Sequence, residues 1–342
     1  MGKTLVQDTE SSARPKKGMV LVHGAGNFEP GYEKPIVGYI QNRLAVKEVF
    51  IKPVFYSDEF KSWLMPQART TMWNQNQEFQ SFHKGFCNEA ARDRILRDAA
   101  FISLAQMSKA ALPFMNLNSL MSLVLQSGAN TSTILGTVSQ VASVALGFPV
   151  QQVIASVNTA FQQPAPATLA TSSAPSAASL GSGGLDLSLV VEMVYHYLYD
   201  GVIAQKVQQI VEQALVEATN DFDEIVLVSH SLGNLVTFDV LNKWSHGATK
   251  VTDWFTLGCP LIKARRLHPG NLGPTGMPPG RVTRWYNVYD TNDIVADALG
   301  PIYSKPGSYI YDVFVEVGTD PLSAHDYLNS NPTRDMIADA LA

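Results

Sequence analysis

The hydrophobic pattern at the start of the chain alternates between two periods. Residues 19–22 form a short apolar run that ends in a glycine-rich turn, and residues 34–46 carry apolar side chains at three- and four-residue steps. Residues 49–56 form a second, largely apolar run. An apolar run, a helical pattern and another run predict two parallel strands joined by a crossover helix.

The same alternation returns in the second half of the chain. Residues 224–228 form an apolar strand, and a helical pattern follows over residues 232–243. The helix that leads back into the sheet is expected at 202–218, and further strands at 251–257, 282–289 and 309–317. This pattern predicts the α/β class, with a mostly parallel sheet flanked by helices.

A long segment without strand patterns separates these two parts. An α/β crossover unit needs about 30 residues, whereas roughly 165 residues lie between Tyr56 and Glu224. Residues 73–107 and 134–161 carry helical patterns, and residues 162–184 form a connector rich in Pro, Ala, Ser and Gly. The expected organisation is an N-terminal extension at 1–17, an α/β core at 18–56 and 200–342, and a mainly helical cap or lid insertion at 57–199.

Charge is distributed unevenly along the chain. It is 46% hydrophobic and only 16% charged, against roughly 25% charged in ordinary soluble domains. No Asp, Glu, Lys or Arg occurs from Ala110 to Leu185, while the rest of the chain is charged almost normally. Polar residues interrupt this uncharged segment, so it lacks the roughly 18 unbroken apolar residues of a membrane span. Residues 1–17 hold no apolar signal-peptide core, so we expect a cytoplasmic protein.

Net charge and cysteine content limit the partners that the sequence predicts. The chain has 25 Lys and Arg against 30 Asp and Glu, so no basic excess is present to bind nucleic-acid phosphates. The two cysteines, Cys87 and Cys259, exclude a disulfide framework and a multi-cysteine metal site. We expect Cys259 to be buried packing, and no paired His/Glu spacing indicates a catalytic zinc. The oligomeric state stays open.

The chemistry of the chain is concentrated where the apolar strand at 224–228 meets the following helix. The string Ser229-His230-Ser231-Leu232-Gly233 places a serine at the tip of a tight strand-to-helix turn, with small residues two positions before and after it. Such a turn projects the Ser231 hydroxyl above the sheet, where the Leu232 N–H can stabilise an oxyanion. The string resembles the nucleophile turn of serine esterases and lipases in the α/β-hydrolase superfamily, in which Gly usually stands where this chain has Ser229.

A serine nucleophile needs a base, and the resemblance implies where that base lies. In the superfamily the triad follows the chain order Ser, then Asp or Glu, then His. His246 and His268 follow Ser231 but precede the best acid candidates. Only His325 lies beyond the segment 282–297, after the last expected strand. We therefore expect His325 to be the base.

The acid should lie on the loop after the strand at 282–289. Asp290 and Asp293 both stand there. The string Thr291-Asn292-Asp293-Ile294-Val295 resembles the acid-bearing segment of class 3 lipases, in which the aspartate before two apolar residues is the triad member. The resemblance favours Asp293 as the acid and leaves Asp290 as the alternative; Asp312 and Asp320 are more distant candidates.

A second glycine-rich turn follows the first strand. His23-Gly24-Ala25-Gly26 resembles the oxyanion loop of the superfamily, whose glycines let backbone N–H groups approach the substrate carbonyl. The resemblance implies Ala25 as the donor, with Gly26 as the alternative, and His23 as the residue that holds the loop. Neither G-x-G-x-x-G nor G-K-[ST] follows, which disfavours a nucleotide site. We expect His23, Gly24, Gly26 and His230 to line the substrate site.

Together these features predict a serine carboxylic-ester hydrolase that acts on a hydrophobic acyl ester, either a small molecule or a lipid, without cofactor or metal. Three alternatives stay open: a thioesterase or acyltransferase with the same triad, a non-catalytic hydrolase scaffold that binds lipid, and peripheral docking of the uncharged insert on a lipid surface. The insert itself is either a cap that lines the acyl pocket or an ordinary helical subdomain packed on the sheet.

Overall fold

The computed structural model describes residues 17–26, 28–46, 48–87, 187–270, 272–319 and 323–342. Its centre is a six-stranded sheet in the order β2-β1-β3-β4-β5-β6, and every neighbouring pair is parallel. The predicted α/β class is therefore confirmed. The strands are β1 (Lys17–Val22), β2 (Ile51–Val54), β3 (Glu224–His230), β4 (Val251–Leu257), β5 (Val282–Tyr289) and β6 (Ile310–Phe314).

The sequence of each strand fits its place in the sheet. The central β3 is buried on both faces from Ile225 onward, as its unbroken apolar run predicts for a parallel strand covered by helices. Pro53 lies in the edge strand β2, where a residue without an N–H group is tolerated. The strand expected at 309–317 is shorter in the structure because the Val317 and Gly318 N–H groups turn away to bind the Asp290 carboxylate.

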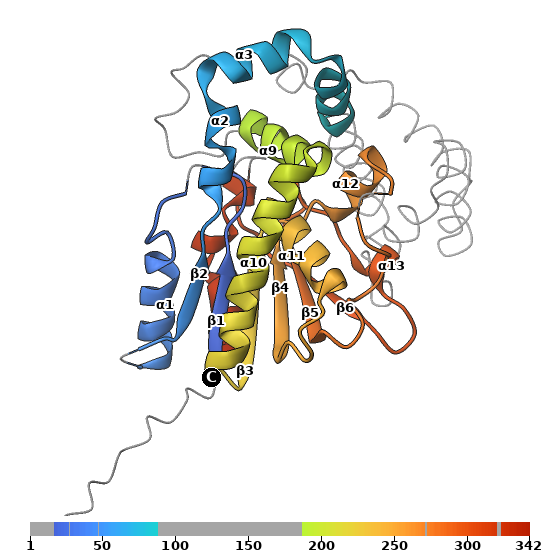
Figure 1. Cartoon of the computed structure of the whole chain (residues 1–342). Coiled ribbons are helices and arrows are strands. Elements are labelled where there is room, and N and C mark those ends of the chain that lie inside the picture. Colours follow the sequence, from blue (N-terminus) through green and yellow to red (C-terminus); the bar gives the residue numbers. More distant parts are fainter. Residues whose placement is uncertain (1–16, 27, 47, 88–186, 271, 320–322) are drawn as a thin grey trace, which may run out of the picture.

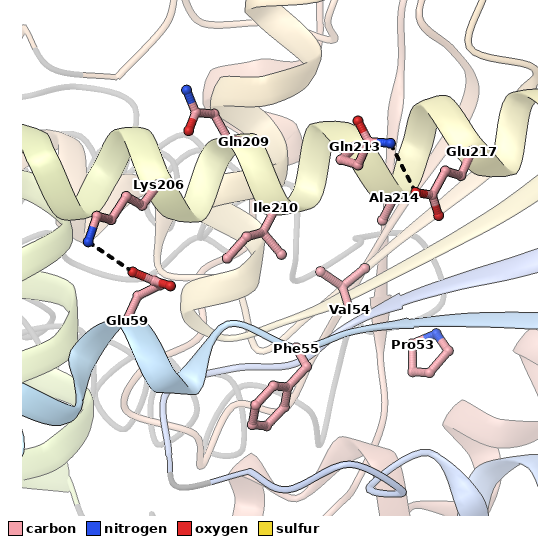
Figure 2. Close-up of a pocket in the computed structure, with 10 residues that line it drawn as sticks. All are labelled: Pro53, Val54, Phe55, Glu59, Lys206, Gln209, Ile210, Gln213, Ala214 and Glu217. Atoms are coloured by element: carbon pink, nitrogen blue, oxygen red, sulfur yellow. Dashed lines mark hydrogen bonds and ion pairs between the residues drawn. The ribbon is translucent and has the colours of Figure 1, made fainter.

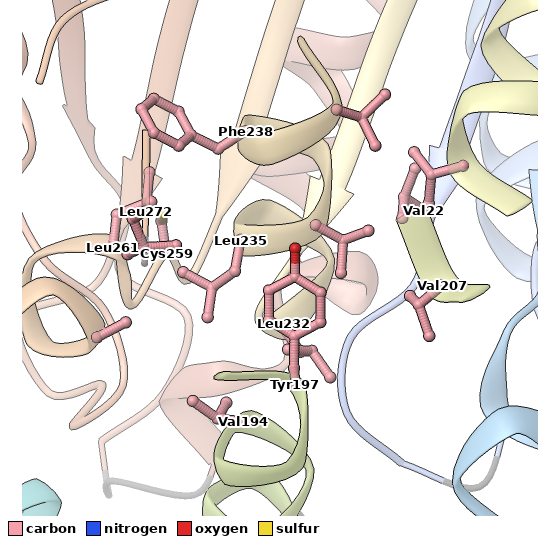
Figure 3. Close-up of a cluster of buried hydrophobic side chains, with 14 of the residues drawn as sticks. Val22, Val194, Tyr197, Val207, Leu232, Leu235, Phe238, Cys259, Leu261 and Leu272 are labelled. Atoms are coloured by element: carbon pink, nitrogen blue, oxygen red, sulfur yellow. The ribbon is translucent and has the colours of Figure 1, made fainter. Parts of the chain in front are cut away.

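Helices cover both faces of the sheet (Figure 1). One face carries α10 (Gly201–Asp221) and α11 (Leu232–Lys243), on which α9 (Leu187–Tyr199) packs, and the other carries α1 (Lys34–Leu44) and α14 (Asn331–Leu341). Figure 3 shows the first core, in which Val194, Val207 and Leu235 converge from the three helices. Cys259 is fully buried in the same cluster, as predicted.

The helix α10 runs along the sheet to the edge strand. It begins at Gly201 because the Asp200 carboxylate caps it, accepting the N–H groups of Val202 and Ile203. Between α10 and β2 lies an open groove of roughly 620 Å³, with the Glu59–Lys206 ion pair at one end (Figure 2). No residue that lines this groove belongs to the candidate site described below.

Short helices follow β2: η1 (Ser57–Phe60), α2 (Lys61–Leu64), α3 (Pro66–Gln75) and a helix over residues 77–87. Within the predicted helical segment 73–107, residues 73–75 end α3 and residues 77–87 form the next helix, while residues 88–107 lie outside the described residues. The chain breaks at Asn76, whose side-chain oxygen accepts the Phe79 N–H and so caps a new helix. The predicted helical segment at 134–161 and the connector at 162–184 lie outside the described residues.

α3 and α9, far apart in sequence, are held together above the carboxyl ends of the strands (Figure 1). Arg69 of α3 donates two hydrogen bonds to the buried Glu192 of α9, at 2.6 and 2.9 Å, and the Trp73 indole N–H donates to the same carboxylate. A bidentate pair of this kind fixes the angle between two helices as well as their contact. Within the described ranges no helix has the length and apolar character needed to cross a membrane.

The remaining short elements lie around the carboxyl end of the sheet. They are α12 (Leu261–Leu267), α13 (Gly300–Tyr303), η3 (Ser323–His325) and η4 (Tyr327–Asn329). Loops at this edge of a parallel sheet are where ligands bind in open α/β folds. The residues that the sequence assigns to the triad and the oxyanion hole follow the carboxyl ends of four strands: Ala25 follows β1, Ser231 and Leu232 follow β3, Asp293 follows β5 and His325 follows β6.

Candidate active site

Ser231 occupies the turn between β3 and α11 in a strained conformation. Its φ and ψ angles are 52° and −123°, in a region that a non-glycine residue rarely adopts. The Ser231 N–H donates to the Leu257 carbonyl at 2.9 Å, which ties the turn to the end of β4. Its side chain is buried, and within the described part of the chain Oγ has no hydrogen-bond partner.

The residues two positions before and two positions after Ser231 are small for different structural reasons. A Cβ atom on Gly233 would collide with the carbonyl oxygen of His23, so only glycine lets α11 approach the end of β1. Ser229 does more than stay small, because its hydroxyl donates to Asn234 Oδ1 at 2.6 Å and accepts from the Trp254 indole at 2.9 Å. The departure from the usual glycine therefore adds a buried hydrogen-bond network beneath the turn.

The loop after β1 lies directly against this turn. A Cβ atom on Gly24 would be 2.6 Å from the Ser231 Cβ. The His23 ring stacks between Phe28 and Tyr56, and its Nε2 accepts the Tyr56 N–H at 3.1 Å. Nδ1 therefore carries the proton and donates to the Gly24 carbonyl at 2.7 Å. Burial lowers the pKa of His23 to about 4, against the opposing effect of that hydrogen bond, so the ring is neutral at pH 7 and holds the loop.

Three backbone N–H groups of the loop after β1 and the start of α11 are the candidate oxyanion donors. The Gly26 N–H donates to the Met193 sulfur of α9 at 3.2 Å. The Ala25 N–H has no acceptor among the described residues, and neither has that of Leu232, the first residue of α11. Two N–H donors, one of them at a helix N-terminus, are thus left for an anion or a carbonyl oxygen.

Asp293 and His325 form a buried pair. His325 Nδ1 lies 2.8 Å from Asp293 Oδ2, which also accepts the Tyr327 hydroxyl at 2.9 Å, and Asp293 Oδ1 accepts the Val295 N–H at 2.8 Å. Burial by itself would raise the pKa of the Asp293 carboxyl, but the neighbouring His325 and these hydrogen bonds outweigh it and lower the pKa. The carboxylate fixes the imidazole orientation and leaves Nε2 as the free ring nitrogen.

Asp290, the alternative acid, is used differently. Its carboxylate accepts three backbone N–H groups, those of Asn292, Val317 and Gly318, at 2.7, 2.7 and 3.1 Å. These bonds join the loop after β5 to the chain that leaves β6. His325 is thus paired with Asp293, whereas Asp290 holds the loop in its conformation through backbone hydrogen bonds.

His325 and Ser231 each lie beside the turn that follows β4, without a hydrogen bond between Ser231 Oγ and His325 Nε2. A Cβ atom on Gly258 would be 2.8 Å from His325 Cε1, while the preceding Leu257 binds the Ser231 N–H. His230, next to the serine, donates from Nε2 to the His325 carbonyl at 3.0 Å, and the two rings lie 4.7 Å apart. Burial, reinforced by His325, lowers the pKa of His230 to about 3, so His230 is a neutral support for the His325 loop.

The structure also shows how the other described candidate acids and bases are engaged. Asp312 is engaged elsewhere, accepting Asn287 and the Leu299 and Gly300 N–H groups, and Asp320 lies outside the described residues. His246 pairs with Glu212 on the surface. In the described ranges no group of three or more His, Cys, Asp and Glu side chains is arranged to hold a metal ion.

Three residues with a clear place at this site were not among the expected site residues: Met193, Gly258 and Tyr327. Gly258 carried a signal, because a glycine directly after a strand marks a turn, and its φ of 57° and its approach to His325 both require it. Tyr327 stands two positions after the expected base, but nothing in the local pattern directs its hydroxyl to Asp293. Met193 lies on a helix far from the loop in sequence.

Comparisons with protein-family models, with curated proteins and with solved structures give no match to this chain. The case for its function therefore depends on the geometry alone. That geometry is a strained serine at a strand-to-helix turn, a buried carboxylate–imidazole pair beside it, and two N–H donors without acceptors among the described residues.

Proposed function

We propose that the chain is a serine hydrolase of the α/β-hydrolase type that cleaves carboxylic esters with a hydrophobic acyl group. The observation that carries the proposal is the strained backbone of Ser231 at the end of a central parallel strand, with the Asp293–His325 pair on the adjoining loops. Strain at one buried residue persists where a function or the surrounding structure demands it. Hydrolysis of p-nitrophenyl esters by the wild-type chain and by Ser231→Ala tests the proposal.

The proposed reaction uses the three residues in order. His325 Nε2 takes the proton of Ser231 as Oγ attacks the ester carbonyl, and Asp293 stabilises the imidazolium that forms. The Ala25 and Leu232 N–H groups hold the tetrahedral oxyanion. An acyl-enzyme forms, and water, activated by the same imidazole, releases the acid. Since the Gly26 N–H already donates to Met193, Ala25 is the better loop donor.

Two glycine substitutions distinguish the effect of a methyl group close to His325 from the effect of backbone strain at a positive φ angle. Gly258→Ala is expected to lower kcat about 100-fold, because the new methyl group would displace the His325 ring and a misplacement of about 1 Å costs this much. Gly280→Ala is the matched control: the φ angles are 57° and 64°, but nothing lies within 4 Å of a Cβ on Gly280. Both variants are assayed on p-nitrophenyl butyrate and by thermal unfolding; equal losses of kcat would contradict the proposed place of His325.

We also propose that the insertion is a cap that contributes to the acyl pocket. The support is that α9 contacts the loop after β1 through Met193 and is tied to α3 by the Arg69–Glu192 pair. Replacing residues 110–185 by a short Gly/Ser linker is expected to change the preference for acyl length while ester turnover persists. The measurement is kcat/KM on esters of 2 to about 12 carbons. An unchanged profile in a folded variant would make the segment a packing subdomain.

The same triad chemistry serves thioesters and acyl transfer, so the leaving group is a separate question. Parallel turnover of an oxyester and a thioester with the same acyl chain, with and without an added alcohol acceptor, distinguishes the three activities.

A further inference from the structure

The Tyr327 hydroxyl is fixed between the two aspartates of the loop after β5. Tyr327 is fully buried and begins η4, two residues after His325. Its oxygen accepts the Asp290 N–H at 2.7 Å and lies 2.9 Å from Asp293 Oδ2. Gly258 makes room for its ring as well as for the imidazole, because a Cβ there would be 2.7 Å from Tyr327 Cε2.

This arrangement fixes the direction of the hydroxyl proton. A backbone N–H can only donate, so the Asp290 contact uses the acceptor side of the Tyr327 oxygen. The proton is left to point at Asp293, where Oδ2 already accepts His325 Nδ1 at 2.8 Å. One carboxylate oxygen thus serves two donors, and the second one competes for the negative charge that holds the imidazole.

We propose that Tyr327 is a positioning residue that sets the pH range in which His325 acts as a base, by sharing Oδ2 of Asp293 with the imidazole. The role in catalysis rests on the proposed hydrolase function. A carboxylate that accepts a further hydrogen bond is a weaker base and stabilises an imidazolium less. The hydroxyl therefore keeps His325 neutral, and able to accept a proton, at a lower pH than the Asp293 contact alone would allow.

Among the groups around Asp293 and His325, Tyr327 is the side chain whose hydrogen bond to Asp293 can be removed by substitution. His230, at the end of β3, packs on the imidazole but is neutral, since burial lowers its pKa to about 3. The Asp290 carboxylate is held by backbone N–H groups and contacts neither ring nitrogen. Asp293 Oδ1 is occupied by the Val295 N–H. Burial raises the pKa of Asp293, but His325 and then these hydrogen-bond donors lower it by more. The net lowering agrees with a carboxylate that accepts several hydrogen bonds.

The test is Tyr327→Phe, measured first without substrate. Titration of the His325 imidazole by NMR is expected to move its midpoint upward by about 0.5 to 1 pH unit, since the carboxylate loses one hydrogen bond and only part of that loss reaches the imidazole. The acid limb of kcat/KM for ester hydrolysis should move upward with it.

Tyr197→Phe is the matched control, because Tyr197 is also a buried tyrosine that donates to a buried carboxylate, Asp239, at 2.6 Å. It should cost similar stability and leave the His325 midpoint unchanged. If Tyr327→Phe does not fold, 3-fluorotyrosine introduced at position 327 keeps the packing and makes the hydroxyl a stronger donor, so the midpoint should move downward.

An unmoved midpoint in either Tyr327 variant, or an equal shift in Tyr197→Phe, would overturn the proposal. The NMR titration decides this even if the chain hydrolyses no ester, in which case the proposed function fails and the Tyr327 result stands alone. If esters are hydrolysed through Ser231 but the midpoint does not move, only the Tyr327 proposal fails.

Discussion

Replacing Ser231 by alanine is expected to abolish ester hydrolysis, with a loss in kcat on the order of 10⁶ if the triad acts as a unit. The substitution removes Ser231 Oγ, the proposed attacking atom, while the turn, the imidazole and the N–H donors stay. The measurement is kcat on p-nitrophenyl esters of increasing acyl length, for the wild-type chain and for Ser231→Ala. The folded state of both is checked by thermal unfolding.

Ser229→Ala is the control for this experiment, because it removes a serine hydroxyl two positions away. That hydroxyl bonds to Asn234 and Trp254 rather than facing the site. The change should cost about 1–3 kcal/mol of unfolding free energy, since two buried partners lose a bond, and it should leave most of the activity below the unfolding temperature. Retention of most activity by Ser231→Ala would show that another residue is the nucleophile.

Asp293→Asn carries the second large effect, a loss of about 10⁴ in kcat. Asparagine has nearly the same shape, but its amide group can present N–H to His325 Nδ1 and so favour the tautomer with the proton on Nε2. The imidazole would then face Ser231 as a donor and could not take its proton. Because the loss of kcat comes from the wrong His325 tautomer, the unfolding temperature of this variant should change little although its kcat falls steeply.

Asp290→Asn is the discriminating comparison for the acid. Asp290 holds three N–H groups and an asparagine has one carbonyl oxygen to offer them, so the main effect is expected on stability. Its kcat should fall far less than that of Asp293→Asn. The two variants are compared by kcat/KM and by thermal unfolding, and a larger kcat loss in Asp290→Asn would reverse the assignment of the acid.

The parts of the site that the sequence could predict are those set by local chemistry. The apolar run of β3, the small residues around Ser231 and the glycines after His23 each encode a turn within a few residues. Alternating periodicity was sufficient for the α/β class. The pairing of His325 with Asp293 followed from a family resemblance, and the structure brings these two side chains together at 2.8 Å.

What the sequence did not reveal depends on contacts between distant segments. Tyr327 meets Asp293 across 34 positions, and Arg69 meets Glu192 across 123, so no periodicity links either pair. The helix break at Asn76 depends on a single side chain: Asn76 caps the helix that follows, so α3 ends at Gln75. The use of Ser229 as a hydrogen-bonding residue needed Trp254 from a neighbouring strand, which the local string does not contain.

Reaction with a fluorophosphonate probe tests most directly whether Ser231 is an activated nucleophile. The chain is incubated with the probe in its native state and after heat denaturation, and the adduct is located by peptide mass spectrometry. We expect one adduct, on Ser231, in the native wild-type chain, and none in Ser231→Ala or in the denatured protein. A folded wild-type chain that acquires no adduct on Ser231 would contradict the proposed hydrolase and favour a scaffold that binds without catalysis.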